Sequence, residues 1–264
     1  MSSPRRTAAG RIVGVGDLPD TGPVSRDLPV PARALAIAAH PDDAEFGCGA
    51  TLAKWAAAGC RAYLLVCTDG SKGTWGEGDD AAALVSTRRA EQRRAAEVLG
   101  VEAVDFLDWP DGELESGLAQ RRQVCEAIRR VQPDVVLGHD PWRRYRLHPD
   151  HRHAGWLLTD GVVAARDPKF FEDLGLAPHR PDAVLLWEAD QPNHVEEVAR
   201  TTEAKLTALL AHRSQYRSTL GIEDDEDLGE ATARVRNRLE RQFEAHGALA
   251  GVAAGEAFHL ISDV

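Results

Sequence analysis

Two histidine and aspartate clusters, far apart in the chain, carry the most specific chemistry in this sequence. The first is the His-Pro-Asp-Asp motif at residues 40–43, and it follows the apolar run 34–39. The second is the His-Pro-Asp-His motif at residues 148–151. A catalytic metal site needs a few imidazole and carboxylate ligands that converge from separate loops and leave one coordination position open. The two clusters therefore predict a metal-dependent hydrolase.

The spacing within the clusters suggests a role for most of their polar side chains. Two imidazoles and one carboxylate, from His40, His151 and Asp43, form a set that suits catalytic zinc and that resembles the ligands of non-haem iron enzymes. Asp42 then lies beside the ion as a general base towards water. His148, three residues before His151, could stabilise an oxyanion or protonate the leaving amine.

For other polar residues near these motifs, the sequence evidence for a role in the site is weaker. Asp150 is a candidate to orient one of the imidazoles from behind. His139 and Asp140 end another predicted strand, and we expect them to line the pocket or to bind backbone groups. His212 is expected to be a packed or helix-surface histidine. Alone, residues 40–43 would equally fit a turn whose aspartate caps a helix, but the second cluster favours the metal site.

Short apolar runs and amphipathic stretches alternate along the chain from residue 34 onward. We expect strands over 34–39, 61–68, 103–107, 134–138 and 183–187, and helices over 47–58, 87–99, 118–131 and 151–165, with mostly helix after residue 201. This alternation predicts an α/β fold with a mainly parallel sheet and helices on both faces. Ligands of such sheets bind outside the carboxyl ends of the strands, which is where both clusters fall.

Composition limits the kind of partner and the compartment. The chain has 264 residues with a net charge of −11, which favours a small-molecule substrate over nucleic acid or an anionic membrane. Residues 1–30 are expected to be a partly disordered arm and residues 31–264 a single domain. There is no apolar stretch of membrane-spanning length and no signal-peptide pattern. The four cysteines lack a Cys-x-x-Cys spacing, which indicates buried reduced thiols and a cytoplasmic protein. The sequence leaves open whether the chain forms a homo-oligomer.

At this point the motifs resemble those of a known family. The chain is similar to the PIG-L/LmbE family of zinc-dependent N-acetylglucosaminyl deacetylases, which includes the deacetylases of mycothiol and bacillithiol biosynthesis. The similarity covers roughly residues 33–218. Its matching elements are Ala39 to Asp43 with Gly47-Cys48-Gly49, Arg88 with Glu91, Leu99-Gly100, Asp111-Gly112, the motif at 148–151, Lys205, and Ala211 to Gln215.

The resemblance implies a Rossmann-like α/β fold and the same roles for the residues of the two clusters. It also implies two contacts to the sugar, from Arg88 and Asp111. One zinc ion per chain is expected, with ferrous iron as the alternative in vivo. The family's usual motif continues directly to a glutamate, whereas here Ala44 precedes Glu45, which affects none of the ligands.

These observations lead to one hypothesis and three rivals. The hypothesis is a zinc hydrolase that removes the acetyl group from an N-acetylglucosamine-type amino sugar or glycoside. An amidase that cleaves a larger acyl group, as on mycothiol S-conjugates, would use the same chemistry. A non-haem iron oxygenase could use the same ligand types but would not need Asp42 or His148. A sugar-binding protein without catalysis would not need the complete set of ligands and base.

Four arginines flank the second cluster, namely Arg143, Arg144, Arg146 and Arg152. They could make the mouth of the site locally positive in an otherwise acidic chain. We expect Arg143, Arg144 and Arg152 instead to pair with surface acids, because such pairing is common and contributes little.

Overall fold

A computed structural model describes residues 24–74, 76, 80–262 and 264 of the protein. Most of the expected N-terminal arm, residues 1–23, lies outside the described residues. The end of that arm is part of the fold, because Ser25 and Arg26 pair with His194 and Val195 in the sheet.

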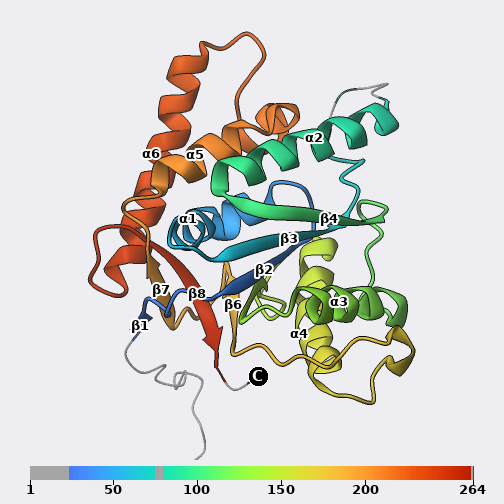
Figure 1. Ribbon diagram of the computed structural model, residues 1–264. Helices are drawn as coiled ribbons and strands as arrows, with labels where there is room; N and C mark the ends of the chain where they lie inside the picture. Colours follow the sequence, from blue (N-terminus) through green and yellow to red (C-terminus); the bar gives the residue numbers. More distant parts are fainter. Residues whose placement is uncertain (1–23, 75, 77–79, 263) are drawn as a thin grey trace, which may run out of the picture.

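The described residues form an eight-stranded sheet in the order β1-β7-β8-β6-β5-β2-β3-β4 (Figure 1). The strands are β1 (Ser25–Arg26), β2 (Arg33–Ala38), β3 (Arg61–Thr68), β4 (Val101–Trp109), β5 (Val135–His139), β6 (Ala183–Trp187), β7 (His194–Glu197) and β8 (Gly255–Ile261). Every pairing is parallel except those of β8, which runs antiparallel to β6 and β7. The expected α/β class with a mainly parallel sheet is confirmed.

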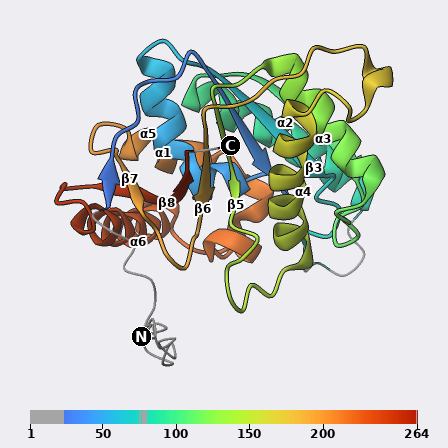
Figure 2. The same ribbon diagram turned by 90° about the horizontal axis from the view of Figure 1, so that it is seen from below.

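Helices cover both faces of this sheet, as Figures 1 and 2 show. The α-helices are α1 (Asp43–Ala57), α2 (Ala81–Leu99), α3 (Leu118–Val131), α4 (Pro149–Arg166), α5 (Thr202–Leu210) and α6 (Leu228–Ala248), with short helical turns at Glu172–Leu174, Arg213–Gln215 and Tyr216–Leu220. Successive side chains of β2 point to opposite faces of the sheet, so they belong to two separate hydrophobic cores. Ala34, Ala36 and Ala38 belong to the core beneath α1 and α2, and Leu35 and Ile37 belong to the core beneath α3 and α4.

Several expected boundaries agree with the structure, and others move for identifiable reasons. The bounds of α3 and β6 are those expected from the sequence. Helix α1 begins at Asp43 rather than at Gly47, so the first histidine and aspartate motif runs directly into it. Helix α2 begins at Ala81 rather than at residue 87, because the Asp80 side chain accepts hydrogen bonds from the first backbone amides of the helix and caps it.

The expectation of mostly helix after residue 201 is wrong for the C-terminal segment. Residues 255–261 form β8, and the first four of its residues are buried between β6 and β7. Strand β7 was likewise not expected. Strand β7 has only four residues, and both strands are specified by long-range pairing, so local sequence patterns carry little signal for them.

Two expectations about composition can be compared with the described residues. Cys48, Cys60, Cys67 and Cys125 are all buried free thiols, as expected. No helix in the described ranges is both long enough and apolar enough to cross a membrane.

Candidate active site

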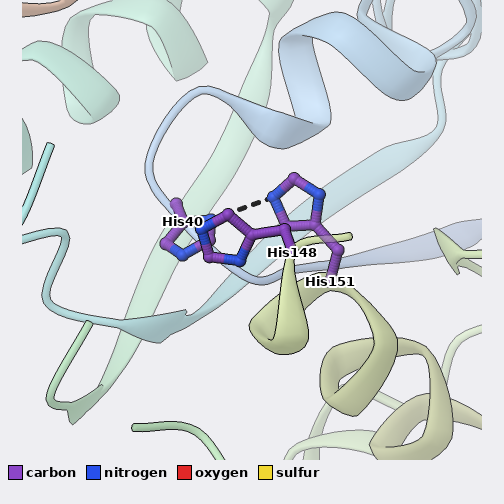
Figure 3. Close-up of side chains that lie close together, drawn as sticks. All are labelled: His40, His148 and His151. Carbon is purple, nitrogen blue, oxygen red and sulfur yellow. Dashed lines mark hydrogen bonds between the residues drawn. The ribbon is translucent and has the colours of Figure 1, made fainter. Parts of the chain in front are cut away.

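The two histidine and aspartate clusters meet at the carboxyl edge of the sheet. His40 follows β2, and Asp43 is the first residue of α1. His148 is the N-cap of α4, and His151 lies in the first turn of the same helix. Figure 3 shows His40, His148 and His151 with their rings turned toward one another.

Three of the candidate ligands, His40, Asp43 and His151, direct their ligand atoms at a common point. Nδ1 of His40 lies 3.1 Å from Nε2 of His151, the contact that is dashed in Figure 3. Asp43 has one carboxylate oxygen 3.2 Å from that His40 nitrogen and the other 3.2 Å from Nε2 of His151. Ligand atoms about 2.0–2.1 Å from one tetrahedral ion lie roughly 3.3 Å apart. The donor set therefore fits a single divalent ion.

Asp150 supports His40 from the side that faces away from this point. Its fully buried carboxylate lies 3.1 Å from Nε2 of His40 and accepts a 2.6 Å hydrogen bond from the Gly112 amide. A proton on Nε2 then leaves the lone pair of Nδ1 directed at the candidate metal position. Asp111 lies on the same side, with Oδ1 3.2 Å from Nε2 of His40.

The electrostatics of this cluster favour a cation. Burial alone would lower the pKa of His40, but bonds to Asp111, Asp150 and Asp43 raise it well above its ordinary value. Burial alone would raise the pKa of Asp43, yet His151 and His139 hold it well below its usual range. A site that retains carboxylates in the ionised form and attracts positive charge is suited to a divalent ion.

His139, which was expected to line the pocket or to bind backbone groups, contacts the candidate ligand Asp43. Its Nε2 lies 3.2 Å from Oδ2 of Asp43, and its Nδ1 accepts a 3.0 Å hydrogen bond from the indole N–H of Trp187. Because indole can only donate, Nδ1 is unprotonated and Nε2 carries the proton that binds Asp43. His139 therefore orients the carboxylate. The approach of Trp187 from β6 had no signal in the local sequence.

Asp42 has an unusual backbone conformation that is held by neighbouring side chains. Its φ is 100°, in the left-handed region. The Asp42 amide donates a 2.9 Å hydrogen bond to the side-chain oxygen of Gln92, whose own amide donates to Glu45. Gln92 was missed in the sequence, although it lies one helical turn after Arg88 on α2 and so faces the same way.

The carboxyl group of Asp42 is buried beside a guanidinium. Burial raises the pKa of Asp42, Arg88 lowers it, and the nearby Asp43 raises it. The resulting pKa is about 6, above the ordinary value of a carboxyl group. Nη2 of Arg88 is 3.5 Å from Oδ2 of Asp42 and donates a 2.6 Å hydrogen bond to the carbonyl of Pro41. Nη1 donates to the carbonyl of Gly70. Arg88 therefore braces the turn that carries Asp42.

A cavity of about 390 Å³ opens above these groups. Seven of the eight site residues expected from the sequence line it, namely His40, Asp42, Asp43, Arg88, Asp111, His148 and His151. The eighth, Asp150, lies behind His40. Further polar lining comes from Gln215, which belongs to the matching element at 211–215, and from Lys72 and Thr219, for which the sequence analysis predicted no role.

His148 is an exposed member of this lining. Its ring stacks on His151 with centroids 4.6 Å apart and meets the His40 ring at 4.6 Å edge to face. Burial, followed by the nearby His40, lowers the pKa of His148 below its ordinary value. Near neutral pH this imidazole is therefore neutral, and it can donate one N–H to a group in the cavity.

The arginines next to the second cluster have partners within the chain: Arg143 and Arg144 pair with acids as expected, whereas Arg152 binds backbone carbonyls and not the expected acid. Arg143 lies 3.1 Å from Glu188, Arg144 lies 3.2 Å from Asp190, and Arg152 donates to the carbonyls of Arg146 and Leu147. Arg146 also pairs with Glu188. These four guanidinium groups therefore do not form a ring of unpaired positive charge around the mouth of the site.

Comparisons with known proteins identify relatives of this chain. Residues 35–161 match the family model described as PIG-L, GlcNAc-PI de-N-acetylase. A diacetylchitobiose deacetylase of Thermococcus kodakarensis is 38% identical over 187 residues, which are 70% of this chain and 70% of that protein. A 1D-myo-inositol 2-acetamido-2-deoxy-alpha-D-glucopyranoside deacetylase of Mycolicibacterium gilvum is 33% identical over 53% of this chain and 58% of its own length.

A solved structure is similar over most of the fold. The N,N'-diacetylchitobiose deacetylase of Pyrococcus horikoshii superimposes with a TM-score of 0.78 at 30% sequence identity, covering 88% of this chain and 84% of the other. The family match includes the carboxyl ends of β2 to β5 and the first helical turns that bear the two clusters. On this evidence the chain belongs to the PIG-L family of deacetylases, enzymes that hydrolyse an amide bond.

Proposed function

We propose that this protein is a zinc-dependent deacetylase that removes the N-acetyl group from an N-acetylglucosamine-type sugar or glycoside. The observation that carries the proposal is the convergence of His40, Asp43 and His151 on one point, beside the buried carboxylate of Asp42. Two imidazoles and one carboxylate with an open position form a typical catalytic zinc set.

The mechanism divides the work among residues that line the cavity. His40, Asp43 and His151 would hold the zinc ion, which when bound would supply Lewis acidity to lower the pKa of water and to polarise the amide carbonyl. Asp42 accepts the proton of the attacking water. His148 donates an N–H to the oxyanion that forms when the carbonyl carbon becomes tetrahedral. The C–N bond then breaks, the leaving amine takes up the proton that Asp42 had accepted, and acetate is released.

The nature of the cavity and the relatives both support an acetylated sugar as substrate. Lys72, Asp111 and Gln215 offer donors and acceptors for hydroxyl groups, and Arg88 faces the same space. The relatives described above are named for activity on diacetylchitobiose and on a 2-acetamido-glucopyranoside of inositol. We accordingly propose Arg88 and Asp111 as the first contacts to the sugar.

A panel of N-acetylated sugars tests this function. Purified protein is stripped of metal, reloaded with zinc or with ferrous iron under anaerobic conditions, and incubated with N-acetylglucosamine, N,N'-diacetylchitobiose and an N-acetylglucosaminyl inositol. Released acetate and primary amine are measured in equal amounts if the proposal holds. Asp42→Asn is the inactive control, because its amide cannot accept the proton.

The same panel separates the rival activities. A zinc-loaded protein that turns over without oxygen excludes an oxygenase. Equal or faster release of larger acyl groups from the same sugars would favour an amidase of broader acyl scope. Binding of the sugars without release of acetate at any metal loading would contradict the proposed function.

A further inference from the structure

Helix α1 is interrupted one turn after the candidate metal ligand that begins it. Cys48, in the interior of the helix, has φ −147° and ψ 18°, which are not helical values. In an uninterrupted α-helix the amide of Ala50 would donate to the carbonyl of Phe46, four residues earlier. At this break two side chains from distant elements, Lys205 of α5 and Glu256 of β8, reach those two backbone groups.

Together these side chains connect the two sides of the break. Oε1 of Glu256 accepts from the Ala50 amide at 3.2 Å, and Oε2 accepts from the Thr51 amide at 2.7 Å. The ammonium group of Lys205 lies 2.6 Å from Oε1 of Glu256 and donates to the Phe46 carbonyl at 2.7 Å. The Lys205–Glu256 pair is thus inserted between a carbonyl and an amide that would be partners in a continuous helix.

Both charges of this pair are deeply buried, with Lys205 1% and Glu256 2% exposed. Burying two charges is costly, and apolar residues of similar volume often stabilise a core equally well. Here every polar contact is directed at the backbone of the broken helix or at the partner charge. A pair of this kind is suited to fixing geometry.

The geometry that it fixes is that of the catalytic turn. Phe46, held by Lys205 through its carbonyl, donates its own amide to the carbonyl of Asp42 at 3.2 Å. Asp42, the neighbour of Asp43, is therefore bound by one hydrogen bond to the residue that Lys205 holds. Lys205 and Glu256 are not among the residues that line the cavity in the described part of the chain.

We infer that Lys205 and Glu256 are positioning residues of the metal site. They hold the first turn of α1 at the angle that brings the Asp43 carboxylate to His40 and His151. The inference rests on the proposed function, because it takes Asp43 as a metal ligand.

Metal affinity tests the inference with a control on the same helix. The test variant is Lys205→Met combined with Glu256→Gln, which removes both charges and keeps similar volumes. The control is Lys54→Met combined with Glu196→Gln, which removes a 2.7 Å ion pair beyond the break, near the end of α1. Zinc Kd is measured by competition with a chelator, and Tm is measured on the metal-free proteins.

The test variant is expected to bind zinc about 10–100-fold more weakly, as when groups that orient a ligand are lost. Its kcat with saturating zinc should fall while KM stays close to that of the parent. The control should retain the parent Kd even where its Tm is lower. If the test variant does not fold, Glu256→Gln is compared with Lys54→Met, because glutamine keeps the volume and one acceptor.

The outcomes distinguish the inference from the proposed function on which it rests. Parent protein that binds no zinc refutes the proposed metal site itself. Parent protein that binds zinc, with an unchanged Kd in the Lys205 and Glu256 variant, overturns the positioning role alone. If the test variant and the control variant both lose zinc affinity in proportion to their loss of Tm, the cause is general destabilisation. That result would also overturn the positioning role.

Discussion

Replacing Arg88 by glutamine should move the acid limb of the pH–activity profile to higher pH. The general base must be ionised, so activity is present above the pKa of Asp42 and is lost as the pH falls through it. Burial raises that pKa to about 6, and Arg88 acts to lower it. A substitution that removes the guanidinium therefore raises the pKa further, and the loss of activity begins at a higher pH.

The structure gives the size of this effect. Nη2 of Arg88 lies 3.5 Å from Oδ2 of Asp42, and both side chains are buried, so solvent screens the interaction weakly. An opposite charge at such a distance lowers a carboxyl pKa by about one to three pH units. Each unit corresponds to about 1.4 kcal/mol. Zinc bound beside Asp42 would lower the pKa of Asp42 in the parent and in the variant alike, so the difference between the two profiles is the quantity to measure.

The assay is kcat/KM for the best substrate of the panel, measured across the acid range with zinc at saturation. Arg89→Gln is the matched control, because Arg89 is the next residue of α2 and pairs with the partly exposed Asp108 instead. Its acid limb should match that of the parent. An active Arg88→Gln enzyme whose acid limb coincides with the parent's would refute the assignment of Asp42 as the titrating base.

Three further substitutions test the other groups of the site. Asp42→Asn should retain zinc, as shown by elemental analysis, and lose about 10²–10⁴-fold in kcat; loss of zinc would instead identify Asp42 as a ligand. His151→Ala should abolish stoichiometric zinc in the purified protein, and unchanged zinc content would remove His151 from the ligand set. Trp187→Phe deletes the N–H that binds His139, and should weaken zinc binding about 10–100-fold in a chelator competition; an unchanged Kd would show that the Asp43 carboxylate needs no such support.

Much of the site could be predicted from the sequence because its chemistry is concentrated in two short motifs. Each motif follows an apolar run that is readable as a strand, and parallel strands bring their carboxyl ends to one edge. The convergence of His40 and His151 followed from these two facts alone.

The supporting residues could not be predicted in the same way, because each acts through a tertiary contact. Trp187 reaches His139 only because β6 lies next to β5, and Gly47 is needed there since a side chain at that position would meet the indole within 2.4 Å. Glu256 belongs to β8, a strand that local pattern did not indicate. The positions of such groups depend on packing between distant elements, which periodicity does not encode.

The proposed metal ligands and part of the cavity wall come from different segments of the chain, which has a consequence for redesigning this enzyme. The proposed ligands come from the turn between β2 and the start of α1 and from α4, whereas Lys72 and Gln215 reach the cavity from segments that follow β3 and α5. This part of the cavity wall and the proposed metal ligands therefore belong to separate segments of the chain. Grafting the segments at 69–74 and 213–220 from a relative should transfer sugar preference while the zinc Kd stays unchanged, which makes these two segments the natural units for exchanging specificity.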